Sequence, residues 1–194
     1  MIPVNSPATT YTPELITGFI NGKPVVRTKA AGSGAAMTTA GNLPDNVTSG
    51  MSVFIVAAQV IAGAGATNDT DGAFFGSGAA VGLTRNSFNN KIVAQLRPST
   101  FIAPTDAIVN GTFYTYRLVY NGSSQYVSIN NATPTSAAIG AGTTTPGTFN
   151  VFNFPGNGGL GNKQIAEIII VTRDLNSAEI TQVETYLKTK YAHY

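Results

Sequence analysis

Residues 51–58 (MSVFIVAA) constrain the fold of this 194-residue chain more than any other segment. The run is almost continuously apolar and rich in β-branched residues, which is typical of a strand buried on both faces of its sheet. A short buried helix would show the same periodicity, so the other segments have to decide between strand and helix.

Those other segments are short β-branched or aromatic runs that recur every 10–20 residues between turns rich in Gly, Asn and Pro. In the clearest hairpin, residues 113–120 alternate in character, Asn121-Gly122 opens the turn, and residues 125–129 return as the partner strand. The pattern predicts an all-β fold, a two-sheet antiparallel β-sandwich or jelly roll. The remaining predicted strands lie at residues 23–27, 73–75, 80–84, 91–96, 149–154 and 164–172, whereas residues 30–50 and 130–148 resemble loops.

The composition agrees with strands joined by turns. Only 10% of the residues are charged, and Thr, Asn, Ser and 21 Gly supply the polar surface, which excludes an all-helical fold. The Lys and Arg residues are scattered singly, which argues against nucleic-acid binding. The absence of Cys excludes thiolate chemistry, and the single His, His193 at a chain end expected to fray, argues against a catalytic triad or a zinc site. No secretory signal and no membrane-spanning segment are visible.

One helix is predicted, over residues 177–190. Asn176 and Glu179 have the spacing of a capping box, which marks the start of a helix. The apolar positions that follow recur at helical spacing and would dock one face of the helix onto the sandwich. They are Ile180, Val183, Leu187 and Tyr191.

The chain divides into an arm and one domain. Residues 1–18 are polar and contain three prolines, which predicts an extended N-terminal arm that becomes ordered on binding a neighbouring subunit. Residues 19–194 are predicted to form a single jelly-roll domain that ends with the helix.

The ending of the chain, residues 165–191 (IAEIIIVTRDLNSAEITQVETYLKTKY), resembles the closing strand and helix of concanavalin A-like, laminin-G-type jelly rolls. Residues 20–27, 51–58 and 114–129 are similar to other core strands of that family. Bacteriophage and bacterial surface proteins carry many such modules. The resemblance implies a concanavalin A-like jelly roll with a C-terminal helix, but a fold alone does not determine a function.

Catalytic carboxylates are not apparent. Retaining glycosidases of this fold resemble one another in carrying Glu-x-Asp-x-x-Glu on one strand, and the chain has no such motif. Glu167 stands alone in its strand and is interpreted as a partner in an ion pair at a strand edge or facing the helix. Glu179 is interpreted as a helix cap and Glu184 as part of the solvated face of the helix. We therefore expect no enzymatic activity and no catalytic residues.

Candidate ligand-binding residues lie in two loops that would form a rim. Asn68, Asp69 and Asp71 fall in a short acidic turn, and Asn157 and Asn162 flank a Gly-rich loop. Carboxylate and amide oxygens suit calcium, but turn propensity alone explains the composition, so we expect no metal and no other cofactor. A sugar-binding rim is the alternative interpretation of these residues.

Four tyrosines on the predicted hairpin allow two interpretations: an aromatic platform for glycans, or packing within the core and across strands. The second interpretation is favoured. The tyrosines are Tyr114, Tyr116, Tyr120 and Tyr126.

These observations predict a non-enzymatic structural protein of a virion surface, such as a bacteriophage capsid decoration or head-surface module. Its partners would be other capsid proteins or copies of itself, contacted through the arm. It would be made in the host cytoplasm and end on the virion surface or outside the cell. The alternative is a glycan-binding lectin or a receptor-binding adhesin module of a tail fibre or bacterial surface that contacts cell-surface glycans. A polysaccharide-degrading enzyme is the remote alternative. Neither nucleic acid nor membrane is an expected partner.

Overall fold

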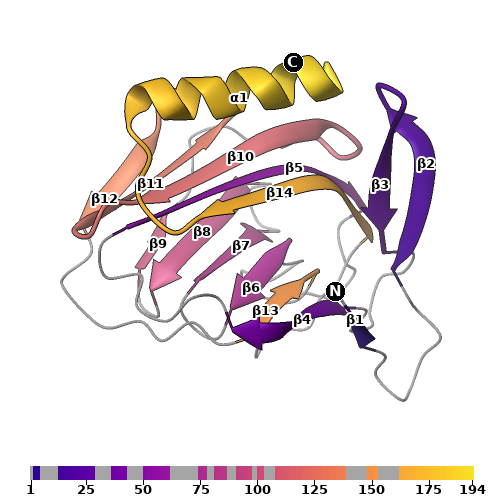
Figure 1. Ribbon diagram of the computed structural model, residues 1–194, viewed down its shortest axis with the longest axis horizontal. Coiled ribbons are helices and arrows are strands. Elements are labelled where there is room, and N and C mark those ends of the chain that lie inside the picture. The colour runs from indigo at the N-terminus through magenta and orange to yellow at the C-terminus, as the bar shows by residue number, and fades with distance from the viewer. Residues whose placement is uncertain are drawn as a thin grey trace.

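Two seven-stranded antiparallel sheets and one helix account for the described part of the chain. The computed structural model describes residues 2–4, 13–28, 36–42, 50–61, 74–77, 81–86, 91–97, 100–102, 108–138, 148–152 and 162–194. Figure 1 shows the two sheets stacked, with the helix α1 (Ser177–Tyr191) lying across one of them on the face turned away from the other. The predicted two-sheet sandwich with a C-terminal helix is confirmed.

We call the sheet under the helix the helix-covered sheet and the other one the opposite sheet. The order in the helix-covered sheet is β12 (Thr135–Ala138), β11 (Ser124–Ile129), β10 (Phe113–Tyr120), β5 (Met51–Ile61), β14 (Asn162–Val171), β3 (Lys23–Arg27) and β2 (Glu14–Ile20). The order in the opposite sheet is β1 (Ile2–Val4), β4 (Ala36–Asn42), β13 (Thr148–Val151), β6 (Phe75–Ser77), β7 (Val81–Asn86), β8 (Lys91–Arg97) and β9 (Thr100–Ile102).

The central strand β5 is buried on both of its faces, as its sequence predicts. Met51, Val53 and Ile55 point into the core between the sheets. Phe54 and Val56 alternate with them and pack beneath α1. Because side chains alternate across a strand, an uninterrupted apolar run supplies both layers at once.

The hairpin of β10 and β11 is also confirmed, with Leu118 opposite Val127 and Tyr120 opposite Gln125. Tyr116 and Tyr120 are buried in the core between the sheets, which confirms the packing interpretation for both. On the other face of β10, Thr115, Arg117 and Val119 lie on the side of the helix-covered sheet that bears α1.

Several predicted strands differ from the structure in their bounds, and some strands were not predicted. The segments predicted at 73–75, 80–84, 91–96 and 149–154 correspond to β6, β7, β8 and β13, with ends shifted by up to three residues. The prediction of loops at 30–50 and 130–148 is wrong in part, because β4 and β12 lie within these segments. Both strands consist mainly of Ala, Thr, Ser, Gly and Asn, whose composition does not distinguish them from turns.

The described residues of the predicted arm take part in both sheets. Residues Ile2–Val4 form β1, which pairs with β4, and Glu14–Ile20 forms β2, which pairs with β3. Within this chain, these parts of residues 1–18 are therefore ordered as edge strands. Contact of the arm with a neighbouring subunit stays a prediction.

The helix begins and docks as predicted. The Asn176 side chain accepts a hydrogen bond from the Glu179 backbone N–H, and the Glu179 carboxylate accepts one from the Asn176 N–H, each at 3.0 Å. Leu187 and Tyr191 are buried against the sheet, and Ile180 and Val183 pack at the edge of the same cluster. No helix among the described residues is both long and apolar enough to cross a membrane.

Gly50, immediately before β5, is required by close packing. Its φ of +145° lies in a region that other residues rarely adopt, and a Cβ there would lie 2.6 Å from the Asp174 backbone nitrogen. Gly111 is a suitable control because its φ is +79° but a Cβ would meet no atom within 4 Å.

We expect Gly50→Ala to lower the free energy of unfolding by about 3 kcal/mol, because the clash adds to the backbone strain. Gly111→Ala should cost about 1 kcal/mol through strain alone. Urea denaturation of both variants measures the difference. Equal losses would contradict close packing at Gly50.

Candidate functional site

A groove of about 220 Å³ lies between the N-terminal end of α1 and the β10–β11 hairpin, on the outer face of the helix-covered sheet. Its floor is apolar, formed by Val119, Leu175 and Ile180, and polar groups surround it. The full lining is Arg117, Val119, Asn121, Tyr126, Pro134, Asp174, Leu175 and Ile180. Two segments far apart in the sequence, residues 117–134 and 174–180, therefore build one concave surface.

A buried ion pair holds the basic side of the groove. Arg117 Nη1 donates to Glu184 Oε1 at 2.8 Å, with the two side chains 9% and 3% exposed. Burial raises the pKa of Glu184, and the charge of Arg117 opposes that rise. Within the described part of the chain this is the one hydrogen bond of the Arg117 guanidinium, so its other N–H groups are free to donate.

The prediction that Glu184 lies on the solvated face of the helix is wrong. Residues 180, 184, 187 and 191 share one face at helical spacing, so Glu184 falls in the middle of the docking face. Its carboxylate is tolerated there because Arg117 projects from β10 to meet it.

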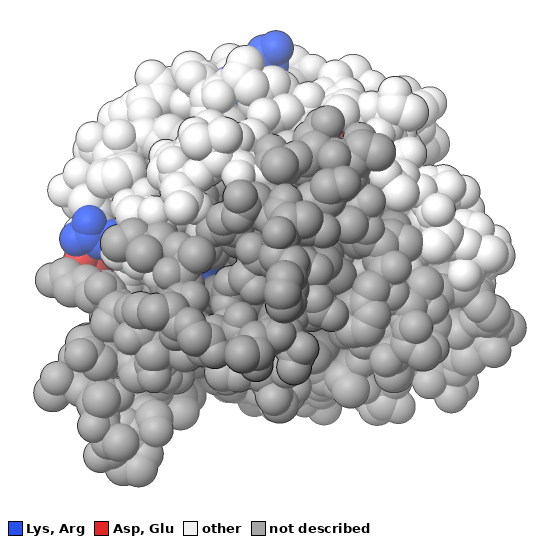
Figure 2. All heavy atoms as spheres, turned by 180° about the vertical axis from the view of Figure 1, so that it is seen from behind, with Lys and Arg blue, Asp and Glu red and all other residues white. Residues whose placement is uncertain are grey.

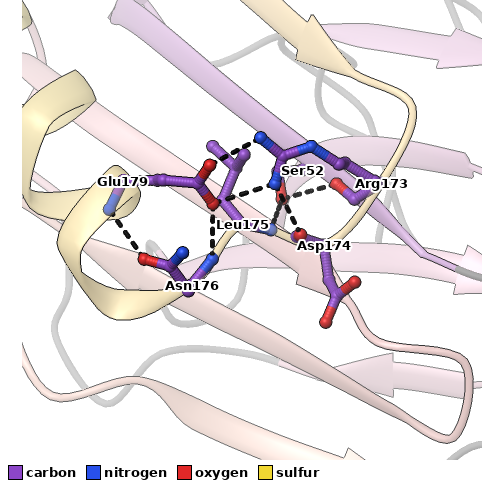
Figure 3. Close-up of polar contacts among 6 residues, drawn as sticks. All are labelled: Ser52, Arg173, Asp174, Leu175, Asn176 and Glu179. Carbon is purple, nitrogen blue, oxygen red and sulfur yellow. Dashed lines mark hydrogen bonds and ion pairs between the residues drawn. The ribbon is translucent and has the colours of Figure 1, made fainter.

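The acidic side of the groove is Asp174, in the short connection between β14 and α1. Ser52 fixes this connection: its hydroxyl donates to the Arg173 carbonyl and accepts from the Leu175 N–H, both at 3.0 Å. Arg173 is turned toward the helix, where it donates to both oxygens of Glu179 at 2.8 and 2.6 Å. Figure 3 shows the Asp174 carboxylate directed away from this network.

The same network explains the charge state of the helix cap. The hydrogen bonds of Glu179 to Arg173 and to the Asn176 backbone lower the pKa of Glu179 to about 2. The capping carboxylate therefore stays ionised at neutral pH, and Arg173 is neutralised by it. Asp174 accepts no hydrogen bond through its carboxylate from any described residue.

The hairpin turn supplies the third side of the groove. The Asn121 side-chain oxygen accepts from the backbone N–H of Ser123 at 3.2 Å and of Ser124 at 2.9 Å, which fixes the amide. Its nitrogen donates to the Tyr126 hydroxyl at 3.4 Å. Tyr126 is half-buried, so part of its ring lines the groove. The groove thus offers a carboxylate acceptor, guanidinium and amide donors, and an aromatic side chain over an apolar floor.

Most of the predicted ligand-binding residues cannot be placed. Asn68, Asp69, Asp71 and Asn157 lie outside the described residues. Asn162 begins β14, and its backbone oxygen accepts from Gln59 Nε2 at 3.4 Å. The groove lies beyond the other end of the same strand, roughly 30 Å away at about 3.3 Å per residue, so Asn162 does not belong to it.

Arg117, Asn121 and Asp174 are the site residues that sequence analysis missed. The sequence indicates only a turn for Asn121, and Asp174 precedes a helix cap, where acidic residues are common. The alternation of residues 113–120 does place Arg117 on one face of its strand, but that face has two possible neighbours until the helix is placed.

The remaining acidic and aromatic candidates have structural roles. Glu167 forms an ion pair with Lys190 at 3.1 Å, as predicted for a residue facing the helix. No three His, Asp or Glu side chains gather to form a metal site among the residues that the structure describes. Of the four tyrosines, Tyr126 alone lines the groove.

The expectation that His193 frays is wrong. Ala192 turns into the left-handed conformation and returns the chain toward the sheet. His193 Nε2 then lies 2.9 Å from the Thr115 hydroxyl, with the Tyr194 ring in contact at 4.6 Å between centroids. Burial, and to a smaller extent the charge of Lys188, lowers the pKa of His193 from 6.5 to about 4.

The comparisons with known proteins show the fold. No protein-family model matches the chain, and no curated protein matches it in sequence. The binding domain of botulinum neurotoxin serotype G superposes with a TM-score of 0.67 at 10% identity, over 91% of this chain and 47% of that one. Trypanosoma rangeli sialidase, in complex with 2,3-difluoro-KDN, superposes with a TM-score of 0.61 at 12% identity, over 92% of this chain and 32% of that one.

A third structure concerns botulinum neurotoxin type C, which depends on interaction with two ganglioside molecules to enter cells. It superposes with a TM-score of 0.54 at 11% identity, over 86% of this chain and 40% of that one. The chain spans less than half the length of each of these structures. At such low identity, the similarity shows a shared β-sandwich fold.

The docked His193 predicts a pH dependence of stability. Between pH 6.5 and about 4 the unfolded chain binds a proton at this residue and the folded chain does not, so stability falls as the pH drops through this window. We expect His193→Gln to reduce that fall by about 1 kcal/mol, because the ring is partly exposed and solvent screens the effect.

Urea denaturation of the parent and the variant at pH 7, 5.5 and 4.5 measures this difference. Because the carboxylates are common to both proteins, the comparison isolates His193. Identical pH profiles would contradict the docking of the ring.

Proposed function

We propose that the chain is a non-enzymatic, glycan-binding module of a surface protein and that the groove beside the N-terminus of α1 is its sugar site. The single observation that carries this proposal is the chemistry of the groove lining. An aromatic ring, a carboxylate without a partner among the described residues and guanidinium N–H groups free of described partners surround an apolar floor. Sugars present hydroxyl donors and acceptors around apolar C–H faces, which is the complementary pattern.

The volume of the groove supports a small ligand. At about 220 Å³ it lies below the roughly 300–1,000 Å³ of pockets that enclose drug-sized molecules. A single sugar ring at the end of a glycan, or one exposed along it, is the largest unit that the groove encloses. The similarity in fold to a neurotoxin that depends on gangliosides supports a glycan as the ligand.

The carboxylates of the described residues support binding over hydrolysis. Each of the four glutamates, Glu14, Glu167, Glu179 and Glu184, forms an ion pair with an Arg or Lys. Glycoside hydrolysis needs two carboxyl groups across one bond, one of them a proton donor. Asp174 is the one carboxylate of the described groove lining, so the described residues of the groove do not supply the second group.

The proposed location is the surface of a particle or cell, and the finer proposal is a bacteriophage capsid or head-surface module of the concanavalin A-like family. Its support is the low charge of the chain, 10% charged residues, with Thr, Asn and Gly in their place. On the face shown in Figure 2, the described residues present charged side chains at only a few points. The exposed apolar side chains Leu15 and Phe19 on the edge strand β2 would suit contact with a neighbouring subunit.

A glycan array probed with the purified chain tests this function. We expect binding to a restricted set of glycans, unchanged by calcium or by a chelator, because the groove needs no metal. Tyr126→Ala should weaken binding roughly tenfold by removing the aromatic contact.

Tyr186→Ala is the matched control, because Tyr186 is 46% exposed on α1 and does not line the groove. Equal losses in both variants would contradict the location of the site. Binding that requires calcium and survives Tyr126→Ala would move the site to the loop of Asp69 and Asp71. A blank array would overturn the glycan-binding function and leave particle association as the remaining account.

A further inference from the structure

We propose that the groove selects neutral, hydroxyl-rich sugar rings and discriminates against sugars that carry a carboxylate. This inference rests on the proposed function, and it names the ligand class of the same site. It follows from the charges that surround the groove rather than from its shape.

The charges of the groove lining are not balanced in the same way. Arg117 and Asp174 are the charged residues of the groove lining. Glu184 lies directly behind Arg117 at 2.8 Å and compensates its charge. Among the described residues Asp174 has no such compensation, because its neighbour Arg173 is held by both oxygens of Glu179. With Glu184 ionised the site carries one net negative charge, and with Glu184 protonated it carries none, so neither state attracts an anion.

An anionic sugar would meet a guanidinium whose charge Glu184 already offsets. A ligand carboxylate would gain a fork of two N–H donors only from Arg117. Nη1 of Arg117 stays with Glu184, which is 3% exposed, so only the remaining N–H groups of Arg117 meet the ligand, and the negative charge of Glu184 reduces their attraction for its carboxylate. The ligand carboxylate would also approach Asp174, and like charges disfavour one another.

A neutral sugar ring matches the polar and apolar groups of the groove lining. Asp174 can accept hydrogen bonds from two hydroxyl groups, since its carboxylate is free of partners among the described residues. Arg117 and the Asn121 amide donate to hydroxyl oxygens from the opposite side without giving up the contact to Glu184. Tyr126 and the apolar floor take the C–H face of the ring. Every polar group of the groove is used, and no charge is left unpaired by the ligand.

Matched pairs of sugars test this inference. The probes are the methyl glycosides of glucose, galactose and mannose and the methyl glycosides of the corresponding uronic acids. Each acid differs from its neutral partner in having a carboxylate in place of one CH₂OH group. Dissociation constants are measured by NMR titration of the full chain at pH 7. We expect at least one neutral glycoside to bind at least tenfold more tightly than its uronide.

Variants separate electrostatics from shape. Asp174→Asn removes the uncompensated charge, and we expect it to reduce the ratio of the two dissociation constants by at least fivefold, whereas loss of shape would weaken both ligands equally. Glu14→Gln is the control, because it removes one negative charge in β2, where Glu14 is paired with Arg27 away from the groove. Raising the salt concentration should also narrow the ratio, because salt screens the repulsion.

Two results would overturn the inference. Tighter binding of a uronide, or a ratio that Asp174→Asn leaves unchanged, would contradict it while the glycan-binding function stands. Binding of none of the six probes, together with a blank glycan array, would remove the proposed function and this inference with it.

Discussion

The burial of β5 on both faces is the constraint on which the rest of this structure depends. One face of the strand joins the core between the sheets, and the other, with Phe54 and Val56, needs a separate cover. The helix α1 provides it and makes the molecule three layers deep beside β5 (Figure 1). Without α1, side chains that are now fully buried would face water, at a cost of roughly 1.5–3 kcal/mol for each large apolar residue.

The covering helix also creates the groove. Its docking face is not purely apolar, because Glu184 sits in it and requires Arg117 on β10 as a partner. Removing one member of such a pair leaves a buried charge without a partner and strongly destabilises the fold. The pair therefore constrains how the helix lies on the sheet. The connection to α1, held by Ser52, then places Asp174 at the rim. The site is thus a consequence of how the third layer is attached.

Local chemistry made much of this fold predictable. The capping box of Asn176 and Glu179 depends on residues three apart. The burial of residues 51–58 on both faces of their strand is predicted by a single continuous apolar run. What could not be predicted depends on long-range partners. Arg117 and Glu184 are separated by 67 positions, and the sequence around either residue does not predict its partner. The strands β4 and β12 were missed for a different reason, because small residues such as Ala, Thr, Ser, Gly and Asn occur in strands and in turns.

Chemical shift mapping of the backbone amides by NMR, during titration with a neutral methyl glycoside that binds, tests the central claim most directly. The account predicts that the largest shifts cluster at residues 117–126 and 174–180, the two segments that meet at the groove. Shifts that gather instead at residues 68–71 and 157–162, with none at Asp174, would contradict it.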